Sequence, residues 1–138
     1  MTGPTTPPAG IHQTRSWVLP LPFTKPLSLN DRAHHMAHAR LTKAWRDATI
    51  VLARKHKIPR LERFTVVLHY APRNPGRRDP DNLIAALKPC IDGMIAAGIA
   101  DDDDHTRHHL TAPVIHPPTG EPGRLWLIIV DLSNGDTP

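Results

Sequence analysis

The chain has almost no cysteine and no long apolar run, and both absences narrow the classes of protein to which it can belong. Cys90 is the single cysteine among 138 residues, so neither an intramolecular disulfide nor a cysteine-based zinc site can form. No apolar stretch approaches the roughly 18 residues that a membrane span requires. The amino terminus lacks the charged start and the apolar stretch of a signal peptide. These absences predict a cytoplasmic protein without a membrane segment.

Basic residues outnumber acidic residues along the chain. Seventeen Lys and Arg stand against 13 Asp and Glu, which gives a net charge of +4 with neutral histidines. Four of the acids stand together at 101–104, so the rest of the surface is more basic than the net charge implies. This distribution favours a polyanionic partner, although the same excess charge would also serve solubility alone.

Length and local composition predict one domain with a loose segment at each end. A chain of 138 residues is long enough to bury a single core. The segment 1–14 is rich in Pro, Thr and Gly and is predicted to be a disordered tail. The segment 133–138 is predicted to be a second loose tail. The folded domain is therefore expected over 15–132, and it contains no internal repeat.

Hydrophobic periodicity predicts two helices and four strands. Apolar residues recur at helical spacing over 32–56, where Asp31 could cap the amino end. A second helix is predicted to start at Pro80 with Asp79 as its cap, and to end at Gly98. Short β-branched or apolar stretches predict strands at 16–22, 64–70, 106–115 and 124–131. The prolines of the first of these strands predict a sheet edge or a strand end. The order β-α-β-α-β-β predicts an α+β (α/β) class, with a small mixed sheet packed against two helices in two layers.

Acidic residues stand at both ends of the second predicted helix. Asp79 and Asp81 are held two residues apart by Pro80, and the run 101–104 follows the helix. Hard divalent ions such as Mg²⁺ take oxygen ligands from one or two carboxylates, water and substrate phosphate. Helical spacing also places four residues on one stripe: Asp81, Ala85, Lys88 and Asp92. The set predicts a divalent-ion site accompanied by a lysine.

Each of these residues also has a simpler explanation when it is considered alone. Asp79 is equally well explained as a helix cap. Lys88 could be a surface lysine paired with Asp92 four residues on. A run of Asp in a loop is most often solvated surface. The spacing of the whole set is what favours a functional site.

Basic residues flank the acidic motif. Arg77 and Arg78 directly precede Asp79, and further cations lie on the first predicted helix at Arg40, Lys43 and Arg46. Such side chains position DNA through its phosphates without reading its sequence. A negative site within a positive surface predicts that a nucleic acid is cut and not only bound.

Histidines and tryptophans each allow two interpretations. Two groups of histidines could hold a transition metal, namely His34, His35 and His38, then His105, His108 and His109. No complete zinc motif is present, so histidines beside a phosphate-binding surface are the simpler interpretation. The apolar surroundings of the tryptophans favour core positions over base-stacking platforms for Trp17, Trp45 and Trp126.

The acidic string resembles the pattern of the RusA family of Holliday-junction resolvases. That pattern is D-x-D-N, a lysine on the following helix, an Asp followed by a segment of small residues and Gly, and an Asp-Asp pair. The matching residues are Asp79-Pro80-Asp81-Asn82, Lys88, Asp92-Gly93-Met94, Gly98 and Asp102-Asp103. The resemblance extends over roughly 15–132.

The resemblance implies a homodimer that binds four-way DNA junctions and uses Mg²⁺ or Mn²⁺ to make paired symmetric nicks. It implies that the lysine role falls to Lys88, although the family's lysine stands one turn earlier, at Ala85 here. It further implies essential acids at Asp79, Asp81 and Asp103, with Asp102 as a supporting metal ligand. Two alternatives remain open: cleavage of other branched DNA such as flaps or forks, and DNA binding without cleavage around a structural cation site.

Overall fold

The structure, a computed structural model, describes residues 15–27, 35–76, 78, 80–100 and 108–132. The two predicted tails lie outside this part of the chain, and so do the proposed cap Asp31 and the acidic residues at 79 and 101–104.

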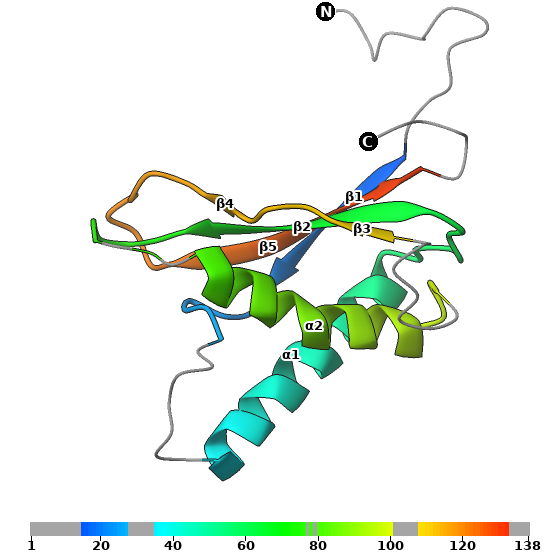
Figure 1. Cartoon of the computed structure of the whole chain (residues 1–138), viewed down its shortest axis with the longest axis horizontal. Coiled ribbons are helices and arrows are strands. Elements are labelled where there is room, and N and C mark those ends of the chain that lie inside the picture. Colours follow the sequence, from blue (N-terminus) through cyan, green and yellow to red (C-terminus); the bar gives the residue numbers. More distant parts are fainter. Residues whose placement is uncertain (1–14, 28–34, 77, 79, 101–107, 133–138) are drawn as a thin grey trace, which may run out of the picture.

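Two helices cover one face of a five-stranded mixed sheet (Figure 1). The elements in chain order are β1 Ser16–Leu21, α1 His35–Lys55, β2 Phe64–Ala71, α2 Pro80–Ala96, β3 His108–Leu110, β4 Val114–Ile115 and β5 Arg124–Asp131. The strand order is β1-β5-β2-β3, with β4 also paired to β2. Strand β5 is antiparallel to β1 and β2, while β3 and β4 are parallel to β2. The predicted two-layer α+β class is confirmed, and β1 lies at an edge as its prolines predicted.

The strand predicted over 106–115 is divided into β3 and β4. Strand β3 pairs Val66 with Leu110, whereas β4 pairs His69 with Val114, so the register shifts by one residue between them. Pro113 lies in the intervening segment and has no N–H to donate to a ladder. The extra residue and the proline together explain the break.

The core is built from alternate residues of the three long strands. Three rows of paired residues face the helices: Leu21–Leu125–Tyr70, Leu19–Leu127–Leu68 and Trp17–Ile129–Val66. The central row is fully buried. From the helices, α1 contributes Trp45, whose ring stacks on Phe23 at 4.9 Å, and α2 contributes its predicted apolar stripe of Leu83, Leu87, Ile91 and Met94.

The other face of the sheet has no helix over it among the described elements (Figure 1). Its rows are Pro20–Trp126–His69, Val18–Ile128–Val67 and Ser16–Val130–Thr65. Two apolar side chains on this side are well exposed: Val18 at 50% and Val114 at 39%. The prediction that all three tryptophans belong to the core is therefore wrong for Trp126, because β5 turns this residue away from the helices.

Both helices end in the same hydrogen-bonded motif. At the end of α2, Gly98 N–H donates to Ile95 C=O and Ile99 N–H donates to Met94 C=O. Gly98 adopts a φ of +87°, the left-handed conformation that this cap requires. The prediction that Gly98 ends the second helix is confirmed. In α1 the equivalent position is taken by Lys57 with a φ of 55°.

The two helices touch at a glycine. A Cβ added to Gly93 would lie 2.6 Å from the carbonyl oxygen of Arg46 and 3.0 Å from the Cβ of Thr49. Only a residue without a side chain allows α2 to lie this close to the backbone of α1. Nearby, Cys90 is fully buried, and burial raises the pKa of its thiol to about 12.

We expect Gly93→Ala to destabilise the protein although alanine is the better helix former. The helix-propensity gain of about 1 kcal/mol is outweighed by the clash with a backbone carbonyl, since overpacking costs about 1–3 kcal/mol. Urea unfolding followed by circular dichroism measures the net change. Ala44→Gly, at an exposed position within α1, is the control that measures the alanine–glycine difference in helix propensity without a packing change. A stabilised Gly93→Ala protein would contradict the close contact.

Candidate functional site

The predicted acidic motif stands at the start of α2. The helix begins at Pro80 as predicted, and Asp81 is its second residue. The structure therefore places the backbone of Asp81 in the first helical turn, where helix N–H groups carry partial positive charge. The side chain of Asp81 and the whole of Arg77 and Asp79 lie outside the described residues, so their roles stay predictions.

A basic cleft lies beside the start of α2. Its volume is about 320 Å³, and its walls include Lys25 after β1, Arg73 after β2, and Arg78 two residues before the helix. Arg78 donates to the carbonyl of Asn74 at 2.8 Å and lies 5.9 Å from the ring centre of Tyr70. No acidic residue is among the described residues that line the cleft. Of these cations, sequence reasoning assigned a role to Arg78 and did not single out the other two.

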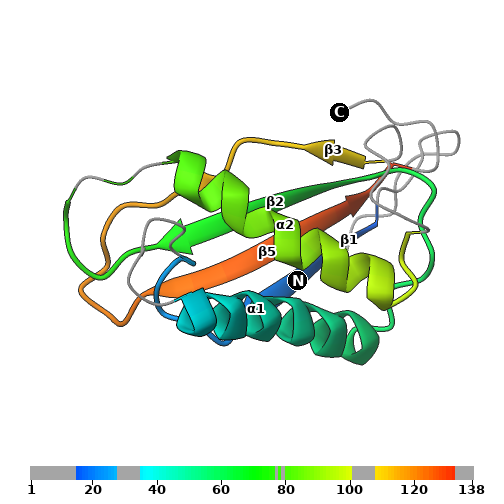
Figure 2. The ribbon, with the colours of Figure 1, turned by 60° about the horizontal axis from the view of Figure 1, so that its bottom comes forward.

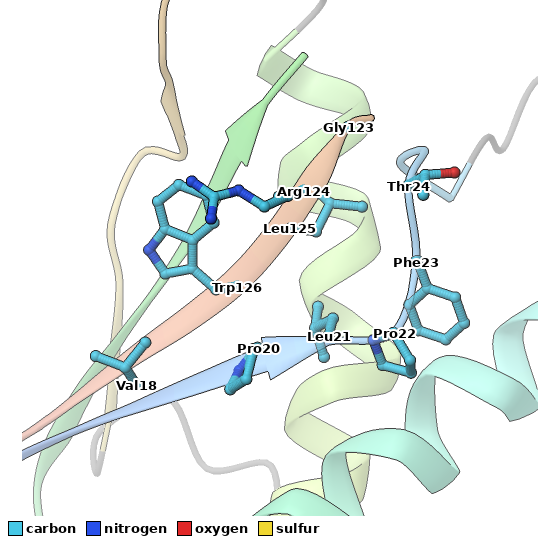
Figure 3. Close-up of a pocket in the computed structure, with 10 residues that line it drawn as sticks. All are labelled: Val18, Pro20, Leu21, Pro22, Phe23, Thr24, Gly123, Arg124, Leu125 and Trp126. Carbon is cyan, nitrogen blue, oxygen red and sulfur yellow. The ribbon is translucent and has the colours of Figure 1, made fainter. Parts of the chain in front are cut away.

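A larger apolar cavity adjoins the basic cleft. It has a volume of about 500 Å³ and lies between the end of β1 and the start of β5 (Figure 3). The two cavities share Thr24 and Gly123. A Cβ on Gly123 would lie 2.1 Å from the carbonyl oxygen of Thr24, so these two loops are in direct backbone contact. The polar side chains of the apolar cavity are those of Thr24 and Arg124.

Lys88 is exposed and paired within its own helix. Its ammonium nitrogen lies 3.6 Å from a carboxylate oxygen of Asp92, and both side chains are partly in solvent. Seven residues of helix separate it from Asp81, a rise of about 10 Å. The simpler interpretation of Lys88 as a partner of Asp92 is therefore confirmed as a contact, while its catalytic role stays a prediction.

In the sequence, helix α2 lies between the acidic motif 79–82 and the acidic run 101–104. Helix α2 has 17 residues and is about 25 Å long, and Figure 2 shows its two ends at opposite ends of the molecule. Asp102 and Asp103 lie outside the described residues, so their sharing of an ion with Asp81 stays a prediction.

The basic residues of α1 are partly neutralised. Lys43 donates to a carboxylate oxygen of Asp47 at 2.6 Å, and Arg46 lies 3.6 Å from the other oxygen. Arg40 is exposed. These three cations were predicted to bind DNA, and the structure leaves that prediction open while placing a carboxylate between two of them.

Three aromatic rings form a cluster on the uncovered sheet face. His69 and His116 share a hydrogen bond of 2.9 Å between Nδ1 and Nε2, and both rings lie about 5 Å from Trp126, at 5.2 and 5.0 Å between ring centres. The guanidinium carbon of Arg124 lies 5.7 Å from the Trp126 ring centre. Sequence reasoning missed this cluster, because His69 comes from a segment 47 residues before His116.

The described starts of the two histidine-containing segments lie apart. His35 begins α1, and His108 begins β3 beside Phe64 at the start of β2; in Figure 2 the start of α1 lies at the left and β3 toward the right. In the part of the chain that the structure describes, no three side chains of His, Cys, Asp or Glu gather as metal ligands. None of the described helices is long and apolar enough to cross a membrane.

Comparison with known proteins gives one distant relative and no family. The chain is 29% identical over 130 residues to an uncharacterized protein of Xylella fastidiosa (strain Temecula1 / ATCC 700964), covering 91% of this chain and 82% of that protein. No family model matches the sequence.

We expect the stability of the protein to fall as the pH drops below about 6.5 because of His69. Burial first, and then the neighbouring His116, lower the pKa of His69 from its ordinary value of 6.5. The unfolded chain therefore binds a proton at a higher pH than the folded one, and unfolding takes up protons in this window. Thermal unfolding from pH 7.5 to 5 measures the effect. His69→Gln should show a shallower loss, and an identical pH profile would refute the assignment.

Proposed function

We propose that the protein is a metal-dependent endonuclease that resolves four-way DNA junctions by paired symmetric nicks. The observation that carries the proposal is that α2 begins at Pro80, within the predicted acidic motif 79–82, two residues after Arg78 of the basic cleft. Carboxylates supply the oxygen ligands that hard cations prefer, and adjacent cations bind DNA phosphates. Carboxylates next to a phosphate-binding cleft suit hydrolysis of a phosphodiester.

The predicted ligands fit Mg²⁺ or Mn²⁺ because they are all carboxylates: Asp79, Asp81, Asp102 and Asp103. A bound ion would lower the pKa of a water molecule and neutralise charge on the phosphate. Arg77 and Arg78 hold the DNA backbone next to the cleaved bond. Lys88 stabilises charge on the phosphate from the helix stripe that it shares with Asp81. Attack of water in line breaks the bond to the 3′ oxygen and leaves a 3′ hydroxyl and a 5′ phosphate.

The length of α2 supports a homodimer with shared active sites. Because a helix of about 25 Å lies between the two acidic groups in the sequence, we propose that a common ion takes Asp81 from one chain and Asp103 from another. A two-fold dimer forms two such sites at once, related by symmetry. Two symmetric sites are also what paired nicks across a four-way junction require.

The first test is cleavage by Asp81→Asn. We expect this variant to nick a synthetic four-way junction at least about 100-fold more slowly than the wild type, since a missing metal ligand costs several kcal/mol in the transition state. Binding of the junction in EDTA should be retained, because the phosphate-binding cations are unchanged.

Glu62→Gln is the matched control, because it removes an exposed carboxylate to which no role in the site is assigned. Wild-type cleavage should need Mg²⁺ or Mn²⁺, stop in EDTA and spare linear duplex. Loss of folding in Asp81→Asn, or nicking at the wild-type rate, would refute the catalytic assignment.

A second test uses mixtures of two inactive variants. If the sites are shared, a heterodimer of Asp81→Asn and Asp103→Asn contains one site with both substitutions and one intact site. An equal mixture, allowed to exchange subunits, should recover up to about a quarter of the wild-type sites. These sites should give single nicks and not paired ones. No recovery after proven subunit exchange would show that each site lies within one chain.

Two other functions remain in competition, and the same assays separate them. Cleavage of flaps or forks in preference to the four-way junction would identify a nuclease for other branched DNA. Binding of DNA without nicking in any metal would identify a DNA-binding protein whose acidic residues serve as helix caps or as a structural cation site.

A further inference from the structure

The apolar cavity and the basic cleft form a single amphipathic recess. The cavity and the cleft meet where Gly123 and Thr24 are in backbone contact, and these two residues line both of them. One half presents three cations, and the other presents apolar and aromatic side chains (Figure 3). A ligand that fills both halves must therefore carry a negative charge on one part and a flat or apolar group on the next.

Aromatic rings and arginines line both halves of the recess. In the cleft Arg78 lies over Tyr70, and in the cavity Arg124 lies over Trp126. Arginine and aromatic side chains are the groups on which unpaired nucleic-acid bases stack. Figure 3 shows the Trp126 ring and the Arg124 guanidinium on one wall of the cavity, with Val18 and Pro20 along the wall formed by β1.

We propose that this recess binds an unpaired nucleotide of single-stranded DNA, with its base in the Trp126 cavity and its phosphates in the cleft of Lys25, Arg73 and Arg78. Duplex DNA cannot fill both halves, because its bases are stacked inside the helix and only its phosphates are presented. Single-stranded segments present both, and a branch point offers unstacked nucleotides. The inference extends the proposed function, on which it rests for the choice of DNA as the ligand.

Charge supports a nucleotide over a purely apolar occupant. The side chains of Lys25, Arg73 and Arg124 are exposed, and no acidic residue is among the described residues that line either half. Glu121 is close in sequence, on the loop before Pro122, but it lines neither half. An apolar peptide or a second copy of the sheet face would cover these cations without neutralising them.

The test is binding of a fluorescent 12-nucleotide oligothymidylate and of a blunt duplex, measured by anisotropy in EDTA at several salt concentrations. Trp126→Ala should weaken binding of the single strand at least about 5-fold, as expected for one lost stacking contact. Its duplex binding should not change. Trp126→Phe, which keeps an aromatic face, should restore most of the affinity.

The salt dependence of binding tests the basic cleft separately. Lys25→Ala and Arg73→Ala should each reduce the slope of log K against log salt for the single strand by about 0.7, the value for one lost phosphate contact. These exposed side chains can be removed without disturbing the core. Lys55→Ala is the matched control. It removes an exposed cation from the carboxyl end of α1 and should leave the slope unchanged.

Three outcomes would overturn the inference. Unchanged binding in Trp126→Ala and Arg124→Ala excludes the cavity, and equal losses for single strand and duplex exclude recognition of an unpaired base. A Trp126→Ala protein that changes its sedimentation mass would instead mark this face as a contact between subunits. The assay needs neither metal nor cleavage, so the recess can be established even if the protein cuts no DNA, and refuted even if it resolves junctions.

Discussion

The contact of α2 with α1 at Gly93 determines where the candidate site lies. A single methyl group at this position would meet the backbone of Arg46 at 2.6 Å, so the distance between the helices depends on its absence. Helix α1 is itself held by Trp45, which is fully buried and stacked on Phe23. Because α2 is one continuous helix, its contact with α1 near the carboxyl end also helps to position its start. The glycine in the Asp-Gly-Met part of the sequence motif therefore has a packing role.

The two ends of α2 differ in how the helix affects the stability of nearby carboxylates. Carboxylates at the start, where the motif 79–82 lies, are favoured by unpaired N–H groups and by the helix dipole. The helix dipole offers no such explanation for the run 101–104, since the carboxyl end of a helix is its negative end. Water or a bound cation would then stabilise these carboxylates. Under the proposed function it is a cation, shared with the acidic residues of a second chain.

The sequence predicted the features that depend on neighbours along the chain. Periodicity located both helices, and the residues Pro80 and Gly98 marked the start and end of α2. Features that depend on distant segments were not accessible. Strand β5 is apolar on both faces, with Leu125 inward and Trp126 outward, so alternation could not show which face the helices cover. For the same reason, the contact of Trp126 with His69 and His116 could not be predicted.

The basic cleft could not be predicted from the sequence either. The topology of the sheet explains how it forms. The register of β5 with both its neighbours pairs Leu125 with Leu21 and with Tyr70. The chain leaves β1 and β2, and enters β5, at this same end of the sheet. Lys25, Arg73 and Arg124 follow or begin these strands, so segments about 50 residues apart along the chain bring their cations to the same end of the sheet. On α1, by contrast, Asp47 stands between Lys43 and Arg46 and reduces their combined charge. The described residues that line the cleft include no carboxylate, whereas one carboxylate stands between two of the cations of the helix on which most of the DNA contacts were predicted.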